Sequence, residues 1–131
     1  MPPKKNHFFS LCKTITTLRS NNGCPWDKNQ TTQSLRKYIL EESAELLGAM
    51  EENDPLHICE ESGDLLFLLL LLTEIHNEDG SFTLDDVLSG INEKMIRRHP
   101  HVFANTATGN EQELKEQWEK IKIEEQGKKT N

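Results

Sequence analysis

Residues 60–72 read EESGDLLFLLLLL. This stretch contains three acids, Glu60, Glu61 and Asp64, followed by eight consecutive apolar side chains. On a helix, Glu61 and Asp64 share one face, because residues three and four apart are neighbours on the helix surface. The run Leu65–Leu72 is apolar on every side, which is typical of a helix covered on several sides. Its cover comes either from the other helices of a monomeric bundle or from a second subunit.

A second acid pair, Glu42 and Glu45, has the same spacing within residues 38–46, YILEESAEL. Glu41 and Glu60 extend each pair by one further acid. Glu-x-x-Glu is common on solvated helix faces, so one copy alone says little. Two copies that interrupt apolar stripes in consecutive helices favour a metal site, because buried carboxylates repel one another unless cations or protons neutralise them.

The ligand types narrow the choice of metal. A ferritin-like di-iron bundle needs histidine three residues after a glutamate on two helices, and neither Glu42 nor Glu61 is followed in that way. Ligation by oxygen alone favours Mg²⁺ or Mn²⁺, held by Glu42, Glu45, Glu61 and Asp64. Four to six carboxylates accommodate one ion or two.

Length, charge and cysteine usage set the broad class. The 131 residues predict a single domain over residues 1–131, with about 7–126 ordered between loose polar ends. A net charge of −7 argues against binding of nucleic acid polymers. No apolar run approaches the ~20 residues that cross a bilayer. The three cysteines are an odd number without paired metal-ligand spacing, which fits a reducing compartment. We therefore expect a soluble cytoplasmic protein.

Five segments have helical signals and none alternates like a strand. The predicted fold is therefore all-α, an antiparallel bundle of about four to five helices. Start and stop signals place the helices at His7 to about Ser20, Thr31 or Thr32 to about Asn53, Pro55 to about Asn77, Thr83 to before Pro100, and Glu111 to Gln126.

Cations that could meet substrate phosphates follow the acid pairs along the chain. They are Lys94, Arg97, Arg98 and Lys122, with Trp118 as an aromatic surface for a base. The plainer alternative is that the segment 94–99 complements a helix dipole and that Trp118 belongs to the core.

These motifs together resemble the MazG-type nucleoside triphosphate pyrophosphohydrolases. The resemblance covers roughly Phe8 to Lys122, and several blocks in succession are far more specific than one acid pair. The matching blocks are CPWDKNQT (24–31), YILEESAEL (38–46), EESGDLLF (60–67), GSFTLDDVL (80–88) and INEKMIRRHPHVF (91–103).

The resemblance implies a helical bundle that dimerises and an Mg²⁺-dependent hydrolysis of a nucleoside triphosphate to the monophosphate and pyrophosphate. It implies that Glu42, Glu45, Glu61 and Asp64 are metal ligands. It also implies nucleotide contacts at the positions of Lys94, Arg98, Trp118 and Lys122. Many members carry two such domains where this chain has one copy, and His57 and Cys59 match no role implied by the family.

The expected mechanism has a cation lowering the pKa of a bound water, with Glu41, Glu42 or Glu60 as the catalytic carboxylate that orients or deprotonates it. One rival is a catalytically weak nucleotide sensor or interaction module on the same scaffold, although such a module would be expected to have lost some of the acids. Another is a pyrophosphatase specialised for one nucleotide. Base and sugar preference, and a homodimer against a tetramer, stay open at this point.

Overall fold

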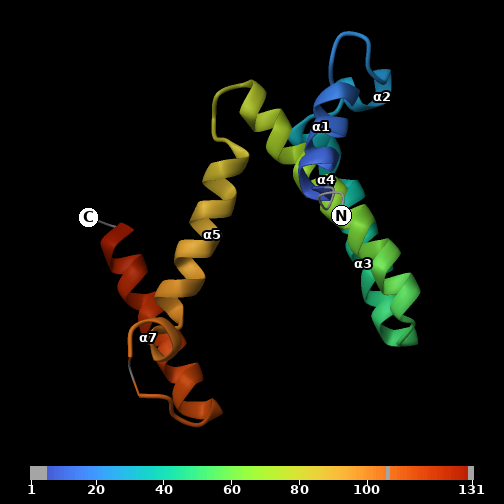
Figure 1. Ribbon diagram of the computed structural model, residues 1–131. Helices are drawn as coiled ribbons and strands as arrows, with labels where there is room; N and C mark the ends of the chain where they lie inside the picture. The colour runs from blue at the N-terminus through green and yellow to red at the C-terminus, as the bar shows by residue number, and fades with distance from the viewer. Residues whose placement is uncertain (1–5, 106, 130–131) are drawn as a thin grey trace, which may run out of the picture. The chain divides into compact units, whose positions relative to one another are not determined.

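The computed structural model describes residues 6–105 and 107–129, and helices are its regular elements (Figure 1). No strand occurs among these residues, which confirms the predicted all-α fold. The predicted loose ends include residues 1–5 and 130–131, which lie outside the described residues. The helices are α1 (His7–Leu18), α2 (Pro25–Lys28), α3 (Thr32–Glu52), α4 (Pro55–Glu78), α5 (Leu84–Arg98), α6 (Pro100–Phe103) and α7 (Glu111–Lys129).

The chain forms two compact units, residues 1–84 and residues 85–131. The first unit contains α1 to α4, and the second contains α6, α7 and all of α5 after its first residue. The single domain expected from the sequence stays a prediction.

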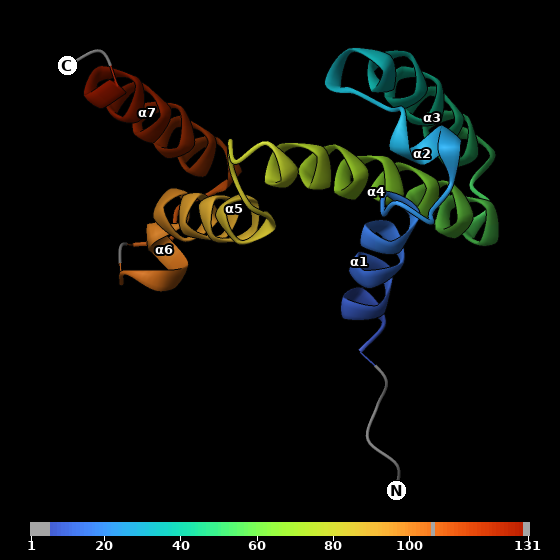
Figure 2. The same ribbon diagram turned by 90° about the horizontal axis from the view of Figure 1, so that it is seen from above.

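An antiparallel pair, α3 and α4, forms the centre of the first unit, and α1 lies against α4 (Figure 2). The turn between the two long helices follows local rules. Asn53 ends α3 in the left-handed conformation with φ of 57°, which Asn tolerates better than most residues. The Asp54 carboxylate then accepts hydrogen bonds from the backbone N–H groups of Leu56 and His57, and Pro55 occupies the first turn of α4.

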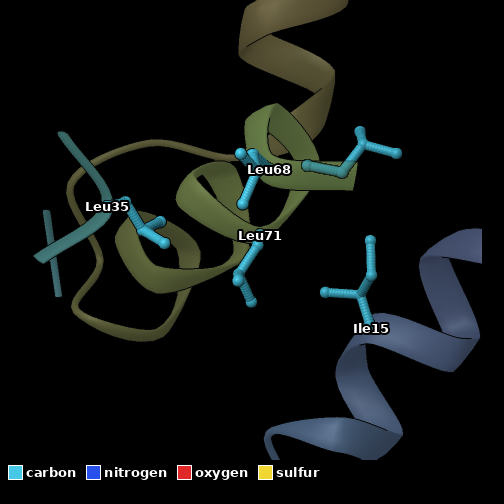
Figure 3. Packing of buried hydrophobic residues seen from close by; sticks show 5 residues of the cluster. Ile15, Leu35, Leu68 and Leu71 are labelled. Carbon is cyan, nitrogen blue, oxygen red and sulfur yellow. The ribbon is translucent and has the colours of Figure 1, made fainter. Parts of the chain in front are cut away.

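The core of the first unit is small and built from three helices (Figure 3). Ile15 of α1, Leu35 of α3 and Leu71 of α4 are almost fully buried, and Leu68 and Leu70 complete the cluster. Burying a side chain of this size contributes about 1.5–3 kcal/mol each. The core therefore fixes how α4 lies against both of its neighbours.

Within the single chain, the other helices cover only part of the apolar run in α4. Leu68 and Leu71 are buried, whereas Leu66 and Leu69 remain 43% and 45% exposed. None of the described helices has both the length and the apolar character required to cross a lipid bilayer.

A largely buried arginine side chain, Arg19, ties the segment between α1 and α3 to the end of α4. The Arg19 guanidinium donates to the backbone carbonyls of Asp27 and Gln30 and forms a two-bond pair with the Glu78 carboxylate, at 2.7 and 3.0 Å. The helix signals in the sequence predicted no helix between Ser20 and Thr31. The segment instead contains the short helix α2, with Pro25 at its start.

The second unit follows the predicted boundaries with two differences. α5 ends at Arg98, as expected before Pro100, and the four-residue helix α6 then begins at that proline. α6 was not predicted because one turn of helix has too short a periodic pattern to detect. α7 begins at Glu111 as predicted and continues to Lys129, beyond the predicted end at Gln126.

Candidate metal centre

Three carboxylates meet between α3 and α4. Glu42 and Glu45 lie three residues apart on α3, and Glu61 comes from α4; one oxygen of each lies within 4.8 Å of the others. The i, i+3 spacing places the first two acids on one helix face, and the packing of α4 against α3 places the third beside them. The sequence predicted all three acids as ligands.

Two oxygens in this cluster lack hydrogen-bond partners. The Oε2 atoms of Glu42 and Glu61 are buried and accept no hydrogen bond from any described residue. Burial raises the pKa of Glu42 to about 7, and the neighbouring negative charge of Glu45 is the next cause. Burial, followed by a hydrogen bond with Glu45, also raises the pKa of Glu61. Both carboxylates are therefore costly to ionise in the folded chain.

The other predicted acids lie around this cluster rather than within it. Asp64 is exposed on α4, one turn after Glu61, and its negative charge contributes to the raised pKa values of Glu42 and Glu61. Glu41 and Glu60 are exposed and form no ion pair with another described residue. The geometry thus separates an inner group of three acids from three outer ones.

The donor set suits a hard divalent cation. All three converging groups are carboxylates, and no histidine or cysteine among the described residues joins them. Buried charged groups are normally paired or bound to metal, and the two partnerless oxygens are groups that a cation would satisfy. Glu42, Glu45 and Glu61 could therefore hold Mg²⁺ or Mn²⁺, with Asp64 nearby.

Sequence reasoning gave no role to His57, which contacts the cluster from its edge. Its Nε2 lies 3.2 Å from Oε1 of Glu61, and its Nδ1 lies 3.0 Å from Oε2 of Glu52. The contact with Glu61 follows from i, i+4 spacing on α4, a signal available in the sequence. The contact with Glu52 depends on the α3–α4 turn and could not be read from spacing alone.

Four predicted phosphate-directed cations line one concavity of about 680 Å³ in the second unit. Arg97 and Arg98 both bind Glu125 there, at 2.7 and 2.9 Å. Lys94 forms no ion pair with a described residue, and Lys122 lies 3.9 Å from Glu119. Sequence reasoning missed Glu125, which neutralises part of this positive charge.

Trp118 lies in a neighbouring cavity of about 380 Å³. The Arg98 guanidinium sits over its ring at 4.9 Å, and the His99 ring meets it edge-on at 5.3 Å. The indole is half-buried by these contacts. The covered ring agrees with the prediction of Trp118 as a core residue, and the adjoining cavity agrees with the prediction of an aromatic surface for a base.

Comparison with known proteins places this arrangement in a family. The family model described as the MazG nucleotide pyrophosphohydrolase domain matches residues 30–103, which include the three inner and the three outer acids of α3 and α4. A nucleoside triphosphate pyrophosphohydrolase of Escherichia coli K12 is 43% identical over 125 residues, covering 95% of this chain and 48% of that protein. The Thermotoga maritima nucleoside triphosphate pyrophosphohydrolase/pyrophosphatase MazG is also 43% identical, over 93% of this chain and 46% of its own length.

A further relative, YabN of Bacillus subtilis, is 48% identical over 93% of this chain and 26% of its own length. The chain thus spans between a quarter and about half of these relatives. Among solved structures, the crystal structure of a mazG-related protein from Thermotoga maritima superposes with a TM-score of 0.72 and 26% identity. The match covers 88% of this chain and 98% of that one.

Replacing Glu42 by Gln should stabilise the protein in EDTA. The change removes one negative charge from a crowded, partly buried cluster, and we expect a rise in the thermal midpoint of about 2–5 °C. Adding Mg²⁺ or Mn²⁺ should raise the midpoint of the wild type by mass action and that of the variant much less. Differential scanning fluorimetry measures both effects. Glu51→Gln, an exposed acid of α3, is the matched control, and an equal metal-dependent rise in both variants would contradict the assignment.

Glu125 should make the second unit sensitive to acid. Hydrogen bonds from Arg98 and then Arg97 lower the pKa of Glu125 to about 2 from its usual 4.5. Because the unfolded chain binds the proton first, the stabilisation is complete above about pH 4.5 and is lost as the pH falls toward 2. Glu125→Gln should therefore unfold at lower urea than the wild type at pH 7, and the difference should shrink below pH 4.5.

Trp118 fluorescence in a Trp26→Phe background reports on this unit, since the chain has two tryptophans. Glu124→Gln is the control for loss of one exposed acid in α7. If the difference in urea midpoint between Glu125→Gln and the wild type stays constant from pH 7 to pH 2, the ion pairs are not its cause.

Proposed function

Because the chain belongs to the MazG nucleotide pyrophosphohydrolase domain family, we propose that it hydrolyses a nucleoside triphosphate to the monophosphate and pyrophosphate. The observation that carries the proposal is the convergence of Glu42, Glu45 and Glu61, in which the Oε2 atoms of Glu42 and Glu61 are buried without a hydrogen-bond partner among the described residues. Such a group is unfavourable for folding by itself, so it is expected where a cation is bound. The names of the Escherichia coli and Thermotoga maritima relatives support the same reaction.

The proposed cation is Mg²⁺, with Mn²⁺ as a substitute, held by Glu42, Glu45, Glu61 and Asp64. When bound, it would supply neutralisation of the triphosphate charge and activation of water for attack between the α- and β-phosphates. The carboxylates of the cluster orient that centre because α3 and α4 fix their positions through the core.

The chain's own residues supply the remaining chemistry. Glu41 and Glu60 adjoin the cluster in sequence, are exposed and form no ion pair with a described residue, so each is a candidate to accept the proton of the attacking water. Glu42 is the third candidate, because it adjoins Glu41 in the chain and belongs to the cluster itself.

We propose phosphate and nucleotide contacts for the basic side chains of the second unit. Lys94 is the clearest candidate, because no described acid neutralises it. Arg97 and Arg98 share Glu125 and present their remaining N–H donors to the concavity. Trp118 and Lys122 complete this proposed set. The net charge of −7 favours single nucleotides over nucleic acid polymers as substrates, and the proposed setting is the cytoplasm.

Pyrophosphate release from the eight common ribo- and deoxyribonucleoside triphosphates tests the proposed reaction. With Mg²⁺ we expect release that EDTA abolishes. Glu42→Gln and Asp64→Asn should each lower the rate by roughly 10²-fold or more while leaving the protein folded, because each removes a carboxylate from the centre. Glu51→Gln should keep the wild-type rate.

The other outcomes separate the rival functions. Full activity in Glu42→Gln would overturn the assigned centre. Metal-dependent stabilisation without release from any nucleotide would favour a nucleotide sensor, and release from one nucleotide of the eight would favour a specialised pyrophosphatase.

We propose in addition that the chain forms a homodimer through the exposed apolar side chains of α3 and α4. Six large apolar side chains on these two helices are between 43% and 83% exposed, which is more than isolated surface residues account for. They are Leu40, Leu47, Met50, Leu56, Leu66 and Leu69. Burial of this surface in a second copy supplies the cover that the sequence predicted for the α4 run.

The double variant Leu66→Lys, Leu69→Lys should therefore sediment as a monomer where the wild type sediments as a dimer. Ile123→Lys, at an exposed apolar position of α7, is the matched control and should keep the wild-type mass. A tetrameric wild type would extend the proposal to a second interface, and a monomeric wild type would contradict it.

A further inference from the structure

His57 joins the ends of both central helices through two carboxylates. Glu52 is the last residue of α3, and His57 is the third residue of α4, so the ring lies beside the turn that connects them. Nδ1 lies 3.0 Å from Oε2 of Glu52, and Nε2 lies 3.2 Å from Oε1 of Glu61. One imidazole therefore bridges an acid at the surface and an acid inside the cluster.

The two ends of this bridge differ in burial. The Glu52 side chain is 60% exposed, His57 is 36% exposed, and the Glu61 side chain is 9% exposed. A contact made only to pair charges would gain little at such an exposed position. The geometric consequence is larger, because a rigid planar ring held at both nitrogens limits where the Glu61 carboxylate can turn.

Glu61 uses its two oxygens differently. Oε1 contacts His57, whereas Oε2 is buried and has no hydrogen-bond partner among the described residues. A glutamate side chain has several rotatable bonds, and fixing them costs conformational entropy that must be met before a cation binds. Histidine and carboxylate partners around metal ligands commonly serve this purpose by orienting the ligand.

We propose that His57, itself held by Glu52, is a positioning residue that fixes Glu61 so that Oε2 is presented with Glu42 and Glu45 to a divalent cation. This proposal rests on the proposed function, because it assumes that the three acids hold a cation. It assigns a role to a histidine for which the family resemblance implies none, and it extends the centre to the last residue of α3.

A different role for His57 predicts the opposite effect of its removal on metal affinity. If the ring acted only as a positive charge beside the cluster, it would compete with the cation, and its removal would tighten metal binding. If the ring positions Glu61, its removal weakens metal binding. Measurement of metal affinity alone, without nucleotide, therefore distinguishes the two.

The experiment titrates Mn²⁺ into the full chain and its variants and follows free Mn²⁺ by electron paramagnetic resonance. His57→Ala should raise the Mn²⁺ dissociation constant by about 10-fold, while His57→Gln, whose amide can still donate to Glu61, should stay within about 3-fold. Glu52→Gln should weaken binding, and Glu51→Gln, the same charge change at the adjacent exposed position, should not. His7→Ala controls for loss of a histidine away from the cluster.

Pyrophosphate release adds a second readout. The loss of pyrophosphate-release rate in His57→Ala should shrink as the Mg²⁺ concentration is raised, because excess metal compensates for a poorly oriented ligand. A merely structural defect would not respond to metal. Circular dichroism of each variant in EDTA confirms that it is folded, and His57→Gln provides the comparison if His57→Ala is not.

Failure of this proposal and failure of the proposed function are distinguishable. Mn²⁺ binding by the wild type that is unchanged or tighter in His57→Ala would overturn the positioning role and leave the metal centre intact. Absence of Mn²⁺ binding by the folded wild type at millimolar metal would overturn both.

Discussion

The antiparallel packing of α3 against α4 is the constraint on which the rest of the first unit depends. Along one part of the helix pair the contact is apolar, with Leu35 in one cluster with Leu68 and Leu71. Along another part of the same pair lie the three acids of the cluster. Because the apolar contact fixes the distance between the helices, Glu42 and Glu61 cannot move apart to relieve their repulsion. The folding energy of the core therefore maintains a cluster that is unfavourable in the absence of a cation.

The same constraint explains why the ends of the two helices are so strongly defined. Asn53 and Asp54 close the turn with a left-handed residue and a capping carboxylate, and Arg19 binds Glu78 at the far end of α4. A slip of α4 by one residue would rotate Glu61 by about 100° around the helix and away from Glu42. The residues of the turn and the Arg19–Glu78 ion pair together hold the register that the acid cluster requires.

Much of this could be predicted from the sequence because it is local. Pro55 after Asp54 and the Thr31 cap mark the helix starts, and i, i+3 spacing places the acids on one face of each helix. The short helices α2 and α6 could not be predicted, since four residues contain no periodic pattern. Which side of the α4 run stays exposed in the single chain could not be predicted either, because uniform hydrophobicity does not indicate which side of a helix is covered.

The partners of the predicted site residues were the least accessible to sequence reasoning. Arg97 and Arg98 were predicted as phosphate-directed cations, yet both bind Glu125, which lies 28 and 27 positions further along the chain, respectively. His57 was set aside for want of a role, although tertiary packing gives it two carboxylate partners. Pairings of this kind depend on which surfaces meet, and spacing within one helix does not determine that.

The central claim is that Glu42, Glu45 and Glu61 are brought together to share a cation. A crystal structure of the protein grown with Mn²⁺, with anomalous diffraction recorded at the manganese absorption edge, tests it most directly. The account predicts an anomalous peak between α3 and α4, with carboxylate oxygens of the three acids about 2.0–2.3 Å from it. A well-ordered crystal with no peak at this position, or with Mn²⁺ held by other residues, would contradict the account.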